Sequence, residues 1–232
     1  MSIRENIARV RENIAHAAAA AGVQADSILL VAASKMNGAE AVREAIAAGV
    51  DACGENRVQE LVEKNALGAY AGAQKHFIGH LQKNKVKQVV GVVDLIQSVD
   101  SPELMELISR RAEGLGLVQD ALLEINLLRE DSKTGMDPAL LKKCLESAVL
   151  CPGIRIRGLM AVPPFGLSEA ENRAYFARMK QLFVDIGGKK YDNVSMDYLS
   201  LGMSGDYTAA IAEGSNMVRV GSAIFGARNY NL

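Results

Sequence analysis

The sequence of 232 residues predicts an α/β fold, a single (β/α)8 TIM-type barrel over residues 1–232 with an extra N-terminal helix. Short apolar runs rich in β-branched residues alternate with helical patterns, which is typical of a parallel sheet covered by helices. Eight such runs occur, and a closed barrel of eight strand–helix units typically takes about 250 residues. An open, doubly wound sheet is the alternative. It is disfavoured because no Gly-x-Gly-x-x-Gly motif follows the first strand.

The predicted elements follow one another in a regular order. An amphipathic stretch from about Ser2 to Ala21 predicts the first helix. Eight apolar runs then predict strands at Leu29–Ala33, Asp51–Cys53, His76–Ile78, Leu95–Ser98, Ala121–Ile125, Ile156–Met160, Tyr198–Leu201 and Met217–Val220. Helical patterns separate these runs at Ala39–Ala48, Val58–Leu67, Pro102–Leu115, Pro138–Leu150, Glu169–Ile186 and Tyr207–Glu213, with the weakest pattern at Asn84–Val90.

The composition is that of an ordinary globular protein, with 49% hydrophobic and 23% charged residues. The net charge is −1, so electrostatics argue against nucleic acid or an anionic membrane as a partner. The sequence has no signal-peptide pattern and no apolar run of membrane-spanning length, and three cysteines without metal-ligand spacing indicate reduced thiols. Together these features predict a cytoplasmic protein. The three histidines are too scattered for a zinc site.

Polar residues without an evident structural purpose collect where the predicted strands end. In barrels of this class the chemistry lies at the carboxyl ends of the strands. These ends carry Lys35, Gly54-Glu55-Asn56, Gly79-His80, Ser98-Val99-Asp100, Asn126, Met160, Gly202-Met203-Ser204-Gly205-Asp206 and Arg219-Val220-Gly221-Ser222. Because unrelated loop residues would not gather so consistently at one end, the pattern predicts a functional site there.

Lys35 ends an almost wholly apolar run that begins at Ile28. A lysine at the carboxyl end of a buried strand is partly stripped of water. Desolvation disfavours the ammonium form, lowers the pKa of the amine and so favours a Schiff-base nucleophile. The alternative is a lysine that only leaves the core and reaches solvent through its flexible side chain.

The segments after the seventh and eighth predicted strands have the composition of an anion-binding site. Phosphate sites in these barrels are often formed by these two loops and a helix N-terminus. The glycines of Gly202–Asp206 let the backbone approach a ligand, Ser204 offers a hydroxyl, and the following helix directs free amides outward. Gly221-Ser222 adds a second small turn with donors. The alternative is that Ser204 and Asp206 are ordinary helix caps.

A reactive lysine near a phosphate site indicates a ligand with an aldehyde at one end and a phosphate at the other, and pyridoxal 5′-phosphate has that shape. Arg219 would then face the pyridine nitrogen and keep it unprotonated, which makes the cofactor a poorer electron sink. The alternative for Arg219 is a structural ion pair, for example with Glu213.

The residues resemble the pyridoxal phosphate homeostasis protein family, whose members are similar to the barrel domain of alanine racemases. The resemblance runs nearly end to end. It lies in Ala33-Ser34-Lys35, Gly54-Glu55-Asn56-Arg57-Val58-Gln59-Glu60, His76-Phe77-Ile78-Gly79-His80-Leu81-Gln82-Lys83-Asn84-Lys85, Ser98-Val99-Asp100-Ser101, Gly158-Leu159-Met160-Ala161-Val162-Pro163, Leu201-Gly202-Met203-Ser204-Gly205-Asp206 and Val218-Arg219-Val220-Gly221-Ser222-Ala223-Ile224-Phe225-Gly226.

The resemblance implies a role for each residue of the predicted site. Lys35 would hold pyridoxal 5′-phosphate as a Schiff base, and Arg219 would meet the pyridine nitrogen. Ser204, Gly221 and Ser222 would help to hold the phosphate, and Asn56 and His80 would line the same pocket. The family implies a protein that binds, buffers or delivers the cofactor and influences amino-acid and keto-acid balance, with pyridoxal-phosphate-dependent apo-enzymes as partners.

The chain also departs from the usual pattern of the family. Cys53 and Arg57 flank the Gly-Glu-Asn motif where aromatic residues are common, and Lys75 stands where an aromatic often precedes His76. Gln97 replaces a common histidine, and Met36 follows Lys35 in place of a polar residue. These positions flank the motifs and leave the proposed ligands unchanged.

Two enzymatic functions remain as alternatives. A low-activity amino-acid racemase would need a second acid/base on the opposite face of the cofactor, which a tyrosine from a separate domain supplies in alanine racemases. The chain ends shortly after the eighth strand, so we expect that domain to be absent and the protein to be a monomer, with Tyr207 and Tyr230 as the nearest substitutes. A Schiff-base aldolase would need a carboxylate beside Lys35 and leaves the phosphate loops unexplained.

Overall fold

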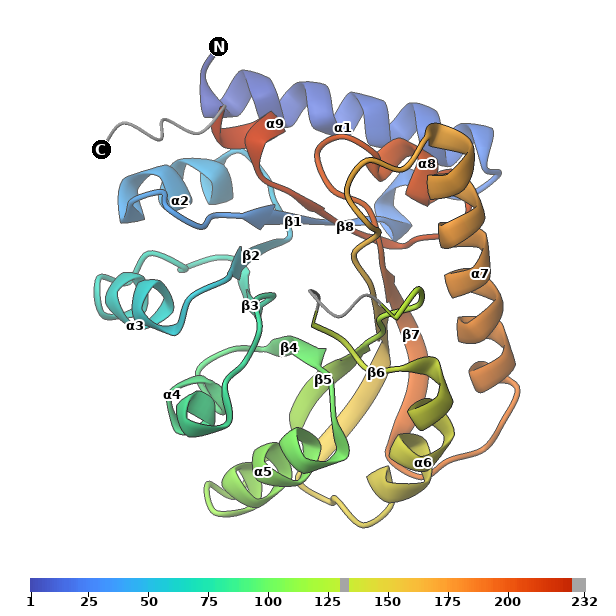
Figure 1. Ribbon diagram of the computed structural model, residues 1–232. Helices are drawn as coiled ribbons and strands as arrows, with labels where there is room; N and C mark the ends of the chain where they lie inside the picture. The colour runs from blue at the N-terminus through green and yellow to red at the C-terminus, as the bar shows by residue number, and fades with distance from the viewer. Residues whose placement is uncertain (130–133, 227–232) are drawn as a thin grey trace.

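The computed structural model describes residues 1–129 and 134–226, and the strands of this part close into a parallel barrel in sequence order (Figure 1). The strands are β1 (Leu29–Ala33), β2 (Ala52–Glu55), β3 (Gln74–Phe77), β4 (Leu95–Val99), β5 (Gln119–Glu124), β6 (Ile154–Met160), β7 (Val194–Ser200) and β8 (Met217–Val220). The barrel closes where β8 pairs in parallel with β1. The predicted fold class is confirmed.

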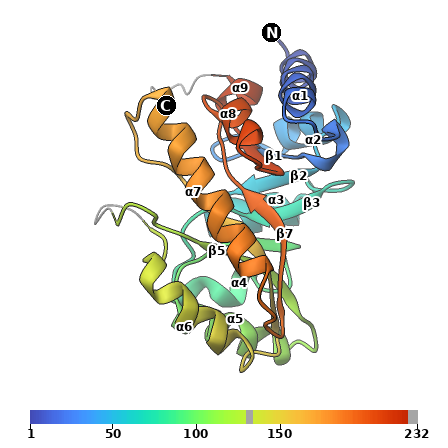
Figure 2. The same ribbon diagram turned by 90° about the vertical axis from the view of Figure 1, so that its right-hand side faces the viewer.

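The helices lie outside the barrel (Figures 1 and 2). They are α1 (Ile3–Ala20), α2 (Ala39–Ala47), α3 (Val58–Ala66), α4 (Val86–Val89), α5 (Pro102–Glu113), α6 (Pro138–Ala148), α7 (Glu169–Gly187), α8 (Tyr207–Ala212) and α9 (Ser222–Phe225), with 3-10 turns at Ala25–Ser27 and Lys83–Lys85. Three predictions are corrected. β2 continues through Gly54 and Glu55, and β7 begins at Val194 and not at Tyr198. The weak pattern at Asn84–Val90 is a 3-10 turn followed by the single-turn helix α4.

The extra N-terminal helix, α1, covers the side of the barrel formed by α8 and α9 (Figures 1 and 2). It begins with a capping box in which the side chains of Ser2 and Glu5 each bond the backbone amide of the other. Asn6 Nδ2 donates to the Ile224 carbonyl of α9 at 2.8 Å, and Asn13 Nδ2 donates to the Tyr207 hydroxyl of α8 at 3.0 Å. These bonds hold the two ends of the described chain together.

The buried apolar residues form a large layer between strands and helices and a smaller cluster inside the barrel. The inner cluster takes one side chain from each of six strands: Val31, Ala52, Leu95, Leu122, Met160 and Met217. Because these side chains come from around a closed barrel, they fill its interior and leave the carboxyl ends of the strands above them for other residues.

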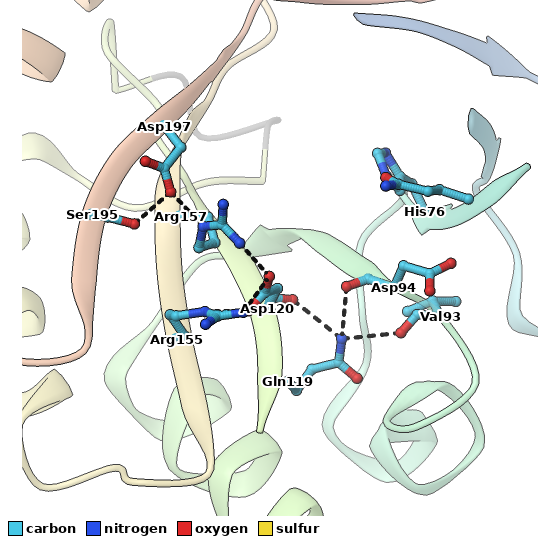
Figure 3. Close-up of polar contacts among 10 residues, drawn as sticks. His76, Val93, Asp94, Gln119, Asp120, Arg155, Arg157, Ser195 and Asp197 are labelled. Carbon is cyan, nitrogen blue, oxygen red and sulfur yellow. Dashed lines mark hydrogen bonds and ion pairs between the residues drawn. The ribbon is translucent and has the colours of Figure 1, made fainter. Parts of the chain in front are cut away.

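Charged side chains connect β5, β6 and β7 near the opposite, amino-terminal ends of the strands. Arg155 donates to both carboxylate oxygens of Asp120, at 2.7 and 3.0 Å, and Arg157 donates to Asp120 at 2.7 Å. Arg157 also bonds Asp197 on β7, so that the charges alternate across the three strands (Figure 3). This ladder lies at the end of the barrel away from the predicted site.

A chain of hydrogen bonds crosses the barrel interior from β8 to β3. Arg219 donates to Ser200 Oγ, Ser200 Oγ donates to Gln97 Oε1 at 2.7 Å, and Gln97 Nε2 lies 2.9 Å from His76 Nδ1. The amide makes Nδ1 the acceptor, so Nε2 carries the proton and faces Gln74 Oε1 at 3.1 Å. His76 is therefore neutral, and burial lowers its pKa to about 4.

The buried His76 should make the protein less stable in mild acid. In the unfolded chain His76 becomes protonated as the pH falls below its ordinary pKa of about 6.5, whereas in the folded protein its pKa is about 4. The free energy of unfolding should therefore fall by about 2 kcal/mol between pH 7 and pH 5 from this group. Urea unfolding of His76→Gln should lose this part of the pH dependence, whereas replacing the exposed His16 by Gln should retain it. Equal slopes for both variants would contradict this account.

Candidate functional site

Lys35 lies in a tight turn that directly follows β1. The Asn37 amide donates to the Ser34 carbonyl at 3.1 Å, so Lys35 and Met36 are the two central residues of a four-residue turn. Met36 has a φ of 63°, which the third position of a type II turn requires and which a residue with a Cβ rarely adopts. Asn37 Nδ2 also donates to the Lys35 carbonyl at 3.0 Å. The turn holds Lys35 half-buried at the carboxyl end of β1.

The loops after β7 and β8 meet beside this turn. Ser204 Oγ accepts hydrogen bonds from the backbone amides of Gly221 and Ala223, at 3.1 and 3.2 Å. A Cβ at Gly221 would lie 3.3 Å from the Ala33 carbonyl oxygen, so glycine lets the end of β8 lie close to the end of β1. Ser222 is exposed and begins α9, a short helix that the sequence analysis did not predict. Lys35, Ser204, Gly221 and Ser222 are thus brought to one edge of the barrel.

The interpretation as an ordinary helix cap is wrong for Asp206, whereas Ser204 Oγ accepts from the Ala223 amide in the first turn of α9 and so does cap a helix. Asp206 stands at the N-cap position of α8, but its side chain accepts from the Met203 amide at 2.6 Å and from no amide of the helix. Gly202 has a φ of 89°, and a Cβ there would lie 2.8 Å from Tyr207 Cα. The loop therefore folds tightly onto α8 and leaves the Ser204 hydroxyl for the amides that follow β8.

Arg219 is a buried cation at the carboxyl end of the barrel. Its guanidinium donates from Nη1 to the Ser200 carbonyl at 2.8 Å and from Nη2 to the Ala161 carbonyl at 2.9 Å, besides its bond to Ser200 Oγ. Burial lowers the pKa of Arg219 to about 10, which still leaves it protonated at neutral pH. The alternative of an ion pair with Glu213 is wrong, because Glu213 pairs with Arg173 at 2.8 Å.

Asn56 and His80 line one cavity of about 310 Å³ at the mouth of the barrel. A Cβ at Gly79 would lie 2.2 Å from the Asn56 carbonyl oxygen, so only glycine allows the chain after β3 to pass Asn56 this closely. The Oδ1 atom of Asn56 is buried and has no hydrogen-bond partner within the described residues. His80 is half exposed, and its Nδ1 lies 3.3 Å from Asp100 Oδ2. The cavity therefore offers polar groups that a ligand can engage.

Glu124, which the sequence analysis missed, lies in the same cavity at the end of β5. Burial raises the pKa of its carboxyl group, and a hydrogen bond from Thr134 Oγ1 at 2.6 Å partly offsets the effect. A glutamate inside the apolar run Ala121–Ile125 was the available signal, because a charged side chain in a buried strand needs a partner or a function.

A buried polar group, of which the sequence analysis named Glu55 but not the partners, lies behind Lys35. Glu55 is fully buried, and its Oε1 atom accepts from Ser34 Oγ at 2.5 Å, from Lys64 Nζ at 2.7 Å and from the Tyr70 hydroxyl at 3.1 Å. Lys64 Nζ also donates to the Ser34 carbonyl at 2.9 Å and lies 3.3 Å from Glu60 Oε2. A glutamate and a lysine in the same strand–helix unit were the only sequence signal for this pair.

Two searches of the described residues concern metal ligands and membrane-spanning helices. No group of three or more histidine, cysteine or carboxylate side chains in residues 1–129 and 134–226 lies in an arrangement that could hold a metal ion. In the same part of the chain, every helix is too short or too polar to cross a membrane. Tyr230, one of the two tyrosines considered as a second base, lies outside the described residues.

Comparison with known proteins adds three findings. The family model for the N-terminal domain of alanine racemase matches residues 3–229. The chain is 38% identical over 230 residues to the pyridoxal phosphate homeostasis protein of Aquifex aeolicus, covering 99% of this chain and 100% of the other. It is 40% identical to the protein of the same name from Escherichia coli K12, covering 99% and 98%.

The structure is also similar to that of PipY from Synechococcus elongatus PCC7942, solved with pyridoxal phosphate bound. The TM-score is 0.85 and the sequence identity 37%, with 97% of this chain and 100% of the other covered. The structure of PipY without the cofactor is similar as well, with a TM-score of 0.87.

Proposed function

Since the chain belongs to the alanine racemase N-terminal domain family, and within it to the pyridoxal phosphate homeostasis proteins, we propose that it binds pyridoxal 5′-phosphate and takes part in intracellular homeostasis of this cofactor. One observation carries the proposal. An amine, a hydroxyl with two backbone amides, and a buried cation lie at the ends of the adjacent strands β1, β7 and β8. These groups fit an aldehyde, a phosphate and a pyridine nitrogen in turn.

The donor set suits a phosphate. The Ser204 hydroxyl accepts from the Gly221 and Ala223 amides, and its own proton remains available to an anion. We assign Ser204, Gly221 and Ser222 to the phosphate.

When bound, pyridoxal 5′-phosphate supplies an aldehyde that condenses with an amine to a Schiff base and releases water. We assign that amine to Lys35. Its turn follows the carboxyl end of β1, and the cavity that Asn56 and His80 line lies at the same end of the barrel, although Lys35 is not among its lining residues. Asn56 and His80 would enclose the ligand there and orient it.

Arg219 favours holding the cofactor over turnover. Its three bonds to Ser200 and Ala161 fix the guanidinium, and with a pKa of about 10 it stays charged at neutral pH. A cation beside the pyridine nitrogen keeps that nitrogen unprotonated, which weakens the ring as an electron sink. We therefore propose that the protein buffers pyridoxal 5′-phosphate or delivers it to apo-enzymes and catalyses no strong turnover reaction. We further propose that it is cytoplasmic and monomeric.

The enzymatic alternatives gain little from the geometry. Tyr207, offered as a second base for a racemase, directs its hydroxyl to Asn13 of α1 on the outside of the barrel. An aldolase would need a carboxylate for proton transfer beside Lys35, but Glu55 and Glu60 are engaged with Lys64 and with the backbone of the Lys35 turn. Exchange of the α-hydrogen of alanine for deuterium by the loaded protein would favour the racemase instead.

The phosphate assignment predicts a selective loss of affinity in Ser204→Ala. A hydrogen bond to a charged group contributes roughly 1.5–3 kcal/mol, so pyridoxal 5′-phosphate should bind about tenfold to 100-fold more weakly. Pyridoxal, which lacks the phosphate, should bind as it does to the wild type. Absorbance titrations with both ligands measure the two affinities, and Thr208→Ala removes an exposed hydroxyl of α8 as the control. An unchanged preference for the phosphorylated ligand in Ser204→Ala would refute the assignment.

A further inference from the structure

Both peptide groups that flank Lys35 are held by side chains of α3. On one side, Lys64 Nζ donates to the Ser34 carbonyl at 2.9 Å. On the other side, Glu60 Oε2 accepts from the Met36 amide at 2.7 Å. Glu60 and Lys64 are four residues apart, so they lie on the same face of the helix and also contact each other at 3.3 Å. The two side chains therefore clamp the turn before and after Lys35.

The clamp is anchored in the core. Lys64 is 7% exposed at its side chain and is paired at 2.7 Å with Glu55, which is fully buried in β2. Glu55 in turn accepts from Ser34 Oγ and from the Tyr70 hydroxyl. Burial raises the pKa of Tyr70, so that it remains a protonated donor. The position of the Lys35 turn is thus tied to β2 and α3 as well as to β1.

The turn needs such support, because its backbone is unfavourable without it. Met36 adopts the left-handed conformation that glycine or asparagine usually occupies, and the residue is 60% exposed, so little packing holds it. Strained backbone persists where the surroundings impose it, and such places cluster at functional sites. Here the bonds from Glu60 and Lys64 end on the two peptides that determine where the Lys35 side chain leaves the main chain.

We propose that Glu60 and Lys64 are positioning residues for Lys35, holding its turn so that the amine meets the aldehyde of the cofactor. This inference rests on the proposed function of Lys35. A well-oriented nucleophile reacts faster, since misplacement by about 1 Å can cost 100-fold in rate. Loss of the clamp should therefore slow the covalent step and spare the binding of phosphate and ring.

Glu60→Ala tests the proposal, because Glu60 is partly exposed and its removal leaves the buried pair in place. Covalent attachment of pyridoxal 5′-phosphate, followed by absorbance, should become about tenfold slower. The affinity for 4-deoxypyridoxine 5′-phosphate, which has a methyl group in place of the aldehyde, should change less than twofold. Glu60→Gln keeps an oxygen that can accept from the Met36 amide and should restore most of the rate.

Glu63→Ala is the matched control, since it removes a carboxylate from an exposed position of the same helix. Equal rates of attachment for Glu60→Ala and Glu63→Ala would overturn the inference. A parallel loss of analogue affinity in Glu60→Ala would also overturn it, because the effect would then be a general loosening of the site. Failure of the wild type to attach the cofactor would remove the proposed function and this inference with it.

Discussion

Replacing Lys35 by Ala is expected to abolish covalent attachment of pyridoxal 5′-phosphate and to leave weak, phosphate-dependent binding. The variant keeps the Arg219 guanidinium and the Ser204 hydroxyl, which the Gly221 and Ala223 amides hold in place. Because the covalent bond keeps the cofactor next to its hydrogen-bond donors, the loss of this bond should weaken the affinity for the cofactor by roughly 100-fold or more. Equilibrium dialysis gives the affinity, and gel filtration shows whether the ligand remains with the protein.

The control for this prediction is Lys87→Ala, which removes an exposed lysine of α4. It should retain the cofactor as the wild type does. Inorganic phosphate should compete with the residual ligand of Lys35→Ala, since the phosphate contacts are among those that remain to hold it. Equal affinity of Lys35→Ala and the wild type would show that Lys35 is not the attachment residue.

Replacing Lys64 by Met is expected to destabilise the protein by about 3–5 kcal/mol, because the change leaves the charge of Glu55 buried and unpaired. The same change removes the ammonium donor to the Ser34 carbonyl. Adding Glu55→Gln should recover part of the loss, since the remaining side chain is then neutral. Urea unfolding of the two single variants and the double variant measures the coupling between the pair.

An exposed ion pair provides the comparison for Lys64→Met. Lys142 and Glu146 are also four residues apart on a helix, but they lie on the surface at 3.8 Å. Lys142→Met should leave the urea midpoint unchanged within error, because exposed pairs contribute little. If Lys64→Met were as mild as Lys142→Met, the buried pair would not support the fold in the manner described.

The fold was predictable because it depends on a repeating pattern. The runs at Leu29–Ala33 and Met217–Val220 match β1 and β8 to the residue, and strand–helix alternation determines that their ends meet. The boundary of β2 was wrong because a buried glutamate interrupts the apolar run, and its compensating lysine lies on the following helix. The helix α9 was missed because a single turn carries almost no periodic signal.

The location of the candidate site could be proposed from the sequence for the same reason, since topology places Lys35, Ser204, Gly221 and Arg219 at one end of the barrel. The hydrogen-bond partners of these residues were not predictable from the sequence. The bonds of Arg219 to Ser200 and Ala161 depend on how the interior packs, and no spacing rule distinguishes them from an ion pair with Glu213. The clamp on the Lys35 turn likewise arises from tertiary contacts between α3 and the end of β1.

The most direct test of the account is to locate the attachment of pyridoxal 5′-phosphate on the wild-type protein. The loaded protein would be reduced with borohydride, which fixes a Schiff base as a stable amine, then digested and mapped by peptide mass. The account predicts one adduct, on the peptide that contains Lys35. An adduct confined to other lysines, or no adduct in a folded and saturated protein, would contradict it.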